Sequence, residues 1–281
     1  AKNHQRIKNL AEKQFISLRQ VEMKGADLSQ FQFDYDLSWA AMFINADGTV
    51  YGRYGTQSAA GADAYNSVES LEKTMHRVLS AHAKYATYKK YLTEKRGKPK
   101  PYKTALQMPG LNQERKEKFQ LLTERKNCIH CHNIHDAENN QLKLTDSWSN
   151  DALWRYPLPD NIGFIIDPKD GLKISKVITG SPAAKAGLKA GQSIAYINDQ
   201  LILSIADIQW VLHNLPLGPT NIKVRTWTDK QERILSTGAG WKKTDVSWRG
   251  SMGSVEPFPG VWAPKATPQE LKKLNLPDSQ H

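Results

Sequence analysis

Residues 128–132 read Cys-Ile-His-Cys-His and contain both cysteines of the chain. Two thiols three positions apart can reach the two vinyl groups on one edge of a porphyrin, and the residue after them can present an imidazole to the iron. One short segment can therefore attach a haem and ligate its metal. The pattern predicts one covalent haem c, attached through Cys128 and Cys131 and ligated on its proximal side by His132.

The same residues allow three other sites. Thiolate and imidazole ligands from Cys128, Cys131, His132 and His135 suit zinc or copper, although four ligands within eight residues are tighter than in ordinary structural zinc sites. A redox-active dithiol would lie where a strand turns into a helix, whereas this pair follows a charged run at 124–127. A structural disulfide between the two cysteines would leave His132 without a role. Haem attachment accounts for the whole pentapeptide.

Length and charge indicate a folded, basic, exported protein. The 281 residues allow about two domains, and 39 Lys and Arg against 28 Asp and Glu give a net charge of +11. No stretch approaches the roughly 18 apolar residues of a membrane span, and no signal peptide opens the chain, so Ala1 would be a mature N-terminus. Covalent haem attachment is normally completed outside the cytoplasm, which predicts a periplasmic or extracellular location.

A basic segment lies directly before the cysteines, with thirteen basic and four acidic residues between Lys84 and Lys126. Such a surface could steer an acidic redox partner or pair with haem propionates. It could equally be a solvated linker, because Pro99 and Pro101 prevent a helix from continuing through it. No nucleic acid is expected as a partner, since no binding motif with aromatic platforms accompanies the charge.

Residues 1–88 are expected to form the first domain. The turn residues Asp47 and Gly48, placed between two apolar runs, predict a β-hairpin. Asn66 with Glu69 three positions later is typical of a capping box that opens a helix. In chain order the expected elements are a helix over 4–15, a strand over 16–21, hairpin strands over 37–45 and 49–54, and a helix with Val68, Leu71, Met75, Val78, Leu79 and His82 on one face.

The stretch over 38–55, Ser-Trp-Ala-Ala-Met-Phe-Ile-Asn-Ala-Asp-Gly-Thr-Val-Tyr-Gly-Arg-Tyr-Gly, resembles the second half of a thioredoxin-like domain. In that family a central strand, a tight turn, an edge strand and a closing helix follow one another in this order. The resemblance implies a thioredoxin-like α/β domain over 1–88. No Cys-x-x-Cys precedes its first helix and no proline precedes Trp39, where the family places its cis-proline. The resemblance therefore implies a scaffold or docking surface instead of a thiol oxidoreductase.

Residues 89–157 are expected to form a basic linker and a small helical haem module, with a helix over 113–126 before the cysteines. A bound haem would supply apolar surface that so short a segment lacks.

The sixth iron ligand stays open between two candidates. His82 lies on the apolar face of its predicted helix, and Met108 lies in a loop before the motif. A methionine would raise the reduction potential, a second histidine would lower it, and an open position would admit small ligands. His135 lies too close in sequence to the proximal ligand to serve, and Met252 would require the C-terminal tail to fold back.

A third region resembles a PDZ domain of the bacterial type. The stretch over 161–164, Asn-Ile-Gly-Phe, resembles the carboxylate-binding loop and the start of the strand that follows it. The stretch over 181–191, Ser-Pro-Ala-Ala-Lys-Ala-Gly-Leu-Lys-Ala-Gly, a strand over 194–198 and a groove helix over 205–215 complete the resemblance. Gln192 departs from the family pattern, which has an aspartate at this place. The domain is expected over 158–236.

The resemblance to PDZ domains implies a peptide-binding groove. Such domains add an extended peptide to a sheet edge and capture its C-terminal carboxylate with backbone N–H groups. The implied peptide-binding residues are Ile162, Gly163, Phe164, Ile208, Val211 and Leu212. The alternative is a PDZ fold used only for intramolecular packing or assembly. A protease is not expected, because the chain contains no Gly-x-Ser-x-Gly elbow.

The last region, 237–281, is irregular and rich in tryptophan. Trp241, Trp248 and Trp262 are expected to pack an arm against the other domains, because aromatic side chains bury large areas. Pro268 at the first position of a short helix closes the chain.

Together these regions predict an α+β multidomain protein: an α/β thioredoxin-like domain, a helical haem c segment and a PDZ β-sandwich or barrel with two helices. The predicted function is that of an extracytoplasmic c-type cytochrome that transfers electrons within a PDZ-organised assembly and has no catalytic residues. The alternative is a haem-based sensor or scaffold that binds partner peptides through the PDZ groove. A haem peroxidase and a zinc or copper protein are further alternatives.

Overall fold

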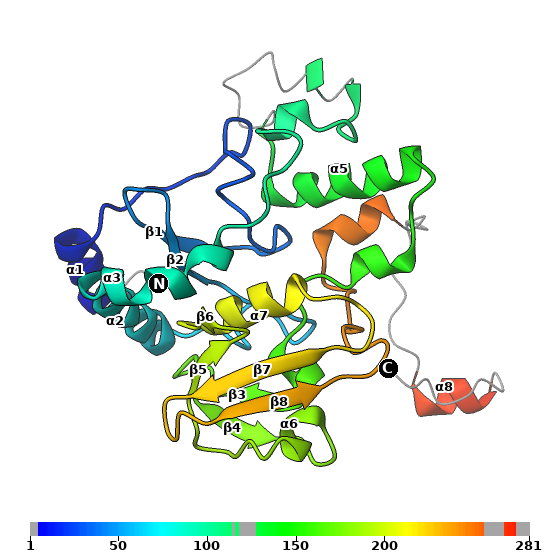
Figure 1. Cartoon of the computed structure of the whole chain (residues 1–281). Coiled ribbons are helices and arrows are strands. Elements are labelled where there is room, and N and C mark those ends of the chain that lie inside the picture. The colour runs from blue at the N-terminus through cyan, green and yellow to red at the C-terminus, as the bar shows by residue number, and fades with distance from the viewer. Residues whose placement is uncertain (1–4, 114–115, 118–127, 256–266, 274–281) are drawn as a thin grey trace.

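The computed structural model describes residues 5–113, 116–117, 128–255 and 267–273 (Figure 1). Most of the helix predicted over 113–126 lies outside these described residues, as does Trp262. Within the described ranges, no helix has both the length and the apolar character needed to cross a membrane.

The N-terminal region combines helices with a two-stranded antiparallel hairpin. Its elements are α1 (Gln5–Gln14), β1 (Ala41–Ile44), β2 (Val50–Tyr54), α2 (Val68–Ala83) and α3 (Tyr85–Tyr88). The predicted first helix, hairpin and long helix are therefore confirmed, with bounds that differ by a few residues.

Local turn chemistry explains the hairpin. Gly48 adopts φ +83°, a conformation that costs glycine little, and its N–H donates to the carbonyl of Asn45 at 2.9 Å. Asp47 Oδ1 accepts from the N–H of Thr49 at 2.9 Å, which stabilises the same turn. The four-residue turn thus reverses the chain where the sequence predicts.

Helix α2 is capped by Ser67, one residue later than predicted. The Ser67 hydroxyl accepts from the N–H of Ser70 at 3.0 Å. Asn66 is instead turned toward the hairpin, where its Nδ2 donates to the carbonyl of Thr56 at 2.6 Å. The predicted capping box is wrong in its residues, although the helix it opens is present.

The strand predicted over 16–21 is wrong. This stretch is coil, and its side chains at Ile16 and Leu18 are 95% and 92% exposed. An alternating apolar pattern forms a strand only where a neighbouring strand and a core receive it. The described residues also show no thioredoxin-like sheet, because β1 and β2 pair only with each other.

Side chains from distant segments cover the outer edge of β2. The N–H of Arg53 donates to Asp207 Oδ1 at 3.0 Å, and the carbonyl of Arg53 accepts from the hydroxyl of Ser204. Lys95 Nζ donates to the carbonyl of Tyr51 at 2.6 Å. The edge groups that another strand would need are therefore satisfied by side chains, and the sheet ends at two strands.

The C-terminal β-rich unit holds two sheets and two helices. A ribbon of two strands and a sheet in the order β6-β5-β7-β8 are antiparallel throughout and are joined by a bridge between Lys173 and Ser193. The elements are β3 (Phe164–Ile166), β4 (Ile174–Val177), α6 (Pro182–Lys185), β5 (Ile194–Ile197), β6 (Gln200–Leu201), α7 (Ile205–His213), β7 (Asn221–Thr226) and β8 (Glu232–Ser236). Its buried core includes Phe164, Ile166, Ile174, Ile194, Ile208, Leu212, Ile222, Val224 and Leu235.

Helix α5 (Cys131–Leu144) rests on a separate core that draws on distant parts of the chain. Met23 and Leu28 from the N-terminal region and Met108 from the basic segment pack with Ile134 of α5. This core crosses the predicted boundary after residue 88. The helical segment is thus completed by packing on its neighbours.

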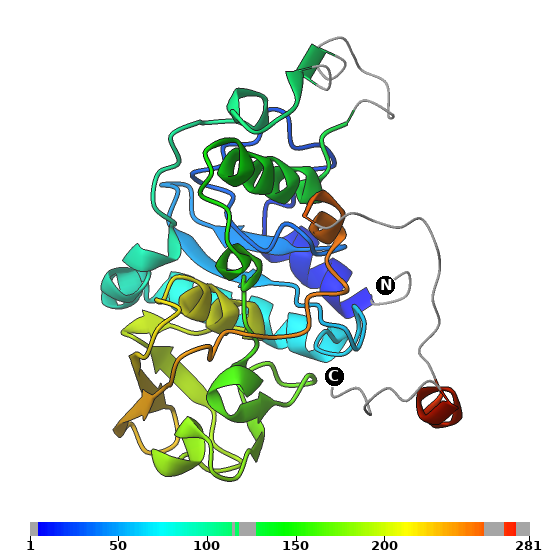
Figure 2. The ribbon, with the colours of Figure 1, turned by 90° about the vertical axis from the view of Figure 1, so that its right-hand side faces the viewer.

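The arrangement in space follows from these contacts. In both views the short 3-10 helix η7 (Gly250–Ser254) from the C-terminal arm lies against α5, and in Figure 2 the hairpin lies between α5 and the β-rich unit (Figures 1 and 2). The arm therefore folds back onto α5. The last helix, α8 (Pro268–Lys273), is drawn apart from the rest.

Candidate functional site

Helix α5 begins inside the Cys-Ile-His-Cys-His motif. His130 is the N-cap residue, and its N–H donates to Asn133 Oδ1 at 3.0 Å, so the helix starts at Cys131. Ile129 is completely buried, and its carbonyl accepts from the N–H of Met23 at 2.9 Å. Cys128 and Cys131 are partly buried and form no disulfide. The motif is thus anchored from the N-terminal region while both thiols stay unpaired.

His132 opens onto a cavity of about 460 Å³. Its side chain is 46% exposed, and its Nδ1 lies 3.4 Å from Asp136 Oδ2 one turn along α5. The loop residues Leu111 and Asn112, and Gly250, Gly253 and Ser254 of η7, also line the cavity. A carboxylate next to Nδ1 orients an imidazole and leaves Nε2 available as a ligand atom.

Gly110 lets one wall of this cavity lie directly against α5, and Gly250 brings the arm into contact with His132. A Cβ at Gly110 would lie 1.9 Å from the carbonyl oxygen of Ala137, so any larger residue would push the loop away from α5. A Cβ at Gly250 would lie 3.6 Å from the Cβ of His132, which places the arm in direct contact with the motif.

A covalent haem at this motif stays a prediction, because the cavity beside His132 is lined by neither of the two cysteines. Cys128 and Cys131 are unpaired and would form the thioether links, and His132 Nε2 would ligate the iron. Of these three residues only His132 lines the cavity, and Cys131 packs against the core under α5. The cavity beside His132 lies within the volume range of cofactor sites, roughly 300–1,000 Å³.

The Cys131 thiol does not resemble that of a reactive dithiol. Burial raises its pKa, and its side chain packs against the core under α5. Catalytic thiols instead have lowered pKa values in electropositive, accessible surroundings. The site therefore does not favour the thioredoxin-type alternative.

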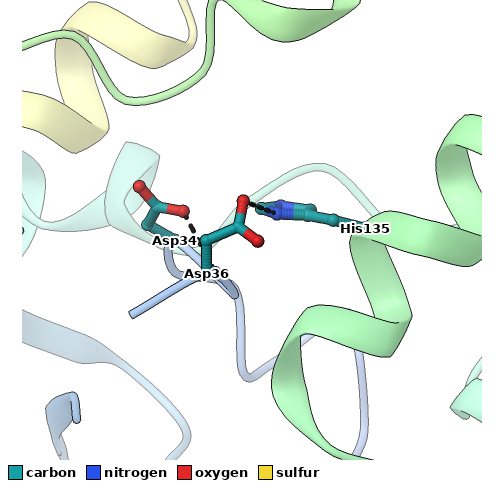
Figure 3. Close-up of side chains that lie close together, drawn as sticks. All are labelled: Asp34, Asp36 and His135. Carbon is teal, nitrogen blue, oxygen red and sulfur yellow. Dashed lines mark hydrogen bonds and ion pairs between the residues drawn. The ribbon is translucent and has the colours of Figure 1, made fainter. Parts of the chain in front are cut away.

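The four-ligand zinc or copper set does not come together in the described residues. His135 turns away from the cavity: it is buried, its ring packs edge-on against Tyr35, and its Nδ1 lies 3.0 Å from Asp36 Oδ2. Among described side chains, the group that could hold a metal ion is instead Asp34, Asp36 and His135 (Figure 3).

Arg249 already compensates the charge of that group. Its Nη1 lies 2.7 Å from Asp34 Oδ1 and 3.1 Å from Asp36 Oδ2, and its Nη2 lies 2.9 Å from Asp34 Oδ2. The side-chain hydroxyl of Ser251 donates to Asp36 Oδ2 at 2.8 Å. The guanidinium of Arg249 bridges both carboxylates and neutralises their negative charge, which is the role that a bound metal ion would have there. The cluster is an ionic anchor that holds the C-terminal arm on α5.

This anchor predicts a pH dependence of stability. Burial alone would raise the pKa of Asp36, but the hydrogen bond and charge of His135 and the charge of Arg249 hold it well below its ordinary value. A carboxylate with a lowered folded-state pKa contributes stability above its unfolded pKa and loses it as the pH falls through the folded value. We expect the difference in unfolding free energy between wild type and Asp36→Asn to shrink as the pH is lowered from 7 to 3.

Urea unfolding at each pH measures this difference, with Asp63→Asn, an exposed aspartate, as the matched control. A difference that stayed constant over this range would show that the ionised form of Asp36 is not specifically stabilised.

Neither predicted distal ligand lies at the His132 cavity. His82 is exposed on α2, and its Nδ1 forms a 2.7 Å hydrogen bond with the hydroxyl of Tyr51. Met108 is 2% exposed and belongs to the core under α5. The cavity walls include neither side chain. The C-terminal arm does fold back, as Met252 would require, and Met252 lies half-buried in η7. The η7 residues that line the cavity are Gly250, Gly253 and Ser254.

The predicted carboxylate-binding loop is already used by the chain itself. Gly163 adopts φ +102°, and its N–H donates to the carbonyl of Asp160 at 3.0 Å. Its own carbonyl accepts from the N–H of Ile178 at 2.9 Å. The Gly163 N–H is thus not free for a peptide carboxylate in this conformation.

The predicted groove side chains are core residues. Exposure is 0% or 1% at Ile162, Phe164, Ile208, Val211 and Leu212, which pack together in the core of the β-rich unit. An open peptide groove would leave several of these side chains accessible. In this conformation they contribute to stability and present no surface to a partner.

The outer face of α7 is buried against the N-terminal region. Lys95 and Asp207 are completely buried and form a 2.8 Å ion pair. The Arg53 guanidinium lies 3.6 Å from the ring centroid of Trp210, and burial lowers its pKa to about 10. Lys95 lies in the segment that the sequence describes as a basic linker, and for this residue that description is wrong. Nothing in its local pattern distinguishes it from its exposed neighbours.

Comparison with known families assigns one part of the chain. Residues 173–226 match the PDZ domain family. A comparison with curated proteins returned no match. The matched segment contains β4 to β7 with α6 and α7. Such domains commonly bind peptides or C-terminal tails or act in scaffolds. Residues 173–226 of this chain are therefore a PDZ domain.

Proposed function

We propose that the protein is a PDZ-based scaffold that carries one covalent haem c at Cys128, Cys131 and His132 and works in the periplasm or the extracellular space. The observation that carries the scaffold role is the burial of α7. The Lys95–Asp207 pair joins the PDZ helix α7 to the basic segment, so the helix holds other regions of the chain in place instead of standing free.

The scaffold positions the haem motif through several contacts. The hairpin and the basic segment dock on α7. Met23, which precedes the hairpin, donates its N–H to the carbonyl of Ile129. Arg249 then ties the C-terminal arm to the loop that contacts His135. The PDZ domain, the arm and α5 are thus connected by buried polar contacts.

Within the site each residue has a separate task. Cys128 and Cys131 would hold the group covalently, and His132 would donate its Nε2 lone pair while Asp136 orients the ring. Gly110 lets the loop before the motif lie directly against α5, beside the turn that follows His132. When bound, the haem would supply a one-electron iron couple.

A second candidate function is electron transfer to a partner protein. The net charge of +11 favours association with an acidic partner at low ionic strength. A haem-based sensor and an electron-transfer protein would share these attachment residues and would differ in whether the bound haem takes up a small ligand.

We expect the protein produced in a host that matures cytochromes c to retain haem after acid-acetone extraction and to give a c-type pyridine haemochrome. The variant Cys128→Ser/Cys131→Ser should lose this covalent haem completely, because no thiol remains to form a thioether. His130→Ala, which changes the motif without removing a proposed ligand, is the matched control and should keep it.

A wild-type protein without a Soret band would overturn the haem assignment and leave the PDZ scaffold standing. The same sample separates the two candidates. A reduced six-coordinate spectrum that carbon monoxide does not alter supports electron transfer, and rapid carbon monoxide binding supports a sensor.

A further inference from the structure

A second cavity, of about 390 Å³, lies at the C-terminal end of the PDZ helix α7. It shares no lining residue with the His132 cavity. One part of its wall is apolar and comes from Trp154, Leu215, Pro216 and Leu217, and the other part carries hydrogen-bond donors. A cavity of this size lies within the volume range of small-ligand sites.

Lys242 is the central donor of this cavity. The residue is 3% exposed, and its Nζ donates to the carbonyl of His213 at 2.9 Å and to the carbonyl of Leu215. These two hydrogen bonds satisfy carbonyl groups at the C-terminal end of α7 and leave the third N–H of the ammonium group to bind a ligand. Burial lowers the pKa of Lys242 to about 8, and no carboxylate of the described residues offsets this effect. A buried ammonium without a counter-ion is costly, which favours an anionic ligand.

His213 supplies a second donor. Its ring stacks on Tyr156 with centroids 4.0 Å apart, and its Nδ1 accepts from the N–H of Tyr156 at 3.4 Å. Burial and then the positive charges of Lys242 and Arg155 hold the pKa of His213 well below its ordinary value. The imidazole is therefore neutral with its proton on Nε2, a donor without a charge of its own.

The charges around the cavity have one predominant sign. Arg155 lines it and donates to Asn139 Oδ1 at 2.8 Å, with the nearest Glu138 oxygen 3.8 Å away. The acidic side chain in the lining is Asp151, which is exposed at the rim. Fixed donors and cations beside an apolar wall attract an anion and exclude a cation.

We propose that this cavity binds a carboxylate carried on a compact apolar body. The carboxylate would accept from Lys242 and from His213 Nε2, and the apolar body would pack against Trp154 and Leu217. A free small carboxylic acid and the last residue of a peptide share this chemistry. The peptide source rests on the proposed scaffold function, whereas the free acid requires neither that function nor the haem.

The test is calorimetric titration of the full-length natively produced protein with phenylacetate and with phenylacetamide, its uncharged analogue. We expect the acid to bind at least about tenfold more tightly than the amide. Lys242→Met should weaken acid binding by about tenfold, and the matched control Lys243→Met, which changes an exposed neighbour, should leave it unchanged. Equal binding of acid and amide by the wild-type chain would overturn the proposal whether or not the variants fold.

A second titration identifies the source of the carboxylate. The probes are an acetylated tetrapeptide that ends in leucine, with a free C-terminus, and the same peptide with a C-terminal amide. Tighter binding of the free-terminus peptide than of phenylacetate assigns the site to a chain terminus, and weaker binding assigns it to a small acid. Failure of both acids to bind would overturn this inference and leave the haem measurements unaffected.

Discussion

Lys95→Met is expected to lower the free energy of unfolding by about 3–5 kcal/mol, the usual cost of removing one partner from a buried ion pair. The substitution leaves the carboxylate of Asp207 buried with only neutral donors, the N–H groups of Arg53 and Leu203. It also leaves the carbonyl of Tyr51 without the donor that now satisfies it. Equilibrium urea denaturation monitored by tryptophan fluorescence measures the change.

Lys98→Met is the matched control for this experiment. Lys98 lies in the same basic segment but is exposed. Its backbone carbonyl accepts a hydrogen bond from Gln32 Nε2, and the substitution leaves this carbonyl in place. Its substitution should change stability by less than about 0.5 kcal/mol. Equal effects of the two substitutions would show that the Lys95–Asp207 pair does not hold α7 against the hairpin.

Arg249→Leu is expected to cost a similar amount, about 3–5 kcal/mol, because it leaves Asp34 and Asp36 buried without their shared cation. The effect should also be local. The backbone N–H of Ser251 and its hydroxyl both bind Asp36, so loss of the anchor should loosen η7 and expose the His132 cavity. Hydrogen exchange should therefore speed up in η7 and in the first turns of α5.

Arg6→Leu provides the comparison, since Arg6 forms an ion pair with Glu72 in which its own side chain is 79% exposed. Exposed pairs contribute about 0–1 kcal/mol. Hydrogen exchange in η7 that is unchanged in Arg249→Leu would show that other contacts hold the arm on α5.

Short-range patterns predicted the local elements well. The turn residues Asp47 and Gly48 determine the hairpin because their contacts span only four residues. The alternating stretch over 16–21 carried a similar local signal, yet it is coil and highly exposed, since no described strand pairs with it. A strand needs a partner, and local pattern does not say whether one is near.

The predicted site residues show the same difference between local and long-range information. The motif residues Cys128, Cys131 and His132 were identified from spacing alone, and the structure places His132 beside a cavity. The distal candidates His82 and Met108 were chosen from helical and loop patterns, and they lie elsewhere. Part of the cavity lining beside His132 comes from the C-terminal arm, which lies more than a hundred positions later in the chain.

By itself the sequence determined the pentapeptide, the PDZ segment at 173–226 and the hairpin, because each depends on residues that are close together in the chain. Tertiary structure alone decided that Lys95 is buried against Asp207 across 112 positions, and that Arg249 binds Asp34 across 215. It also decided that the predicted groove residues fill a core. Burial and charge pairing depend on which distant surfaces meet, and a lysine in a basic run has the same local pattern whether it lies in water or in the interior.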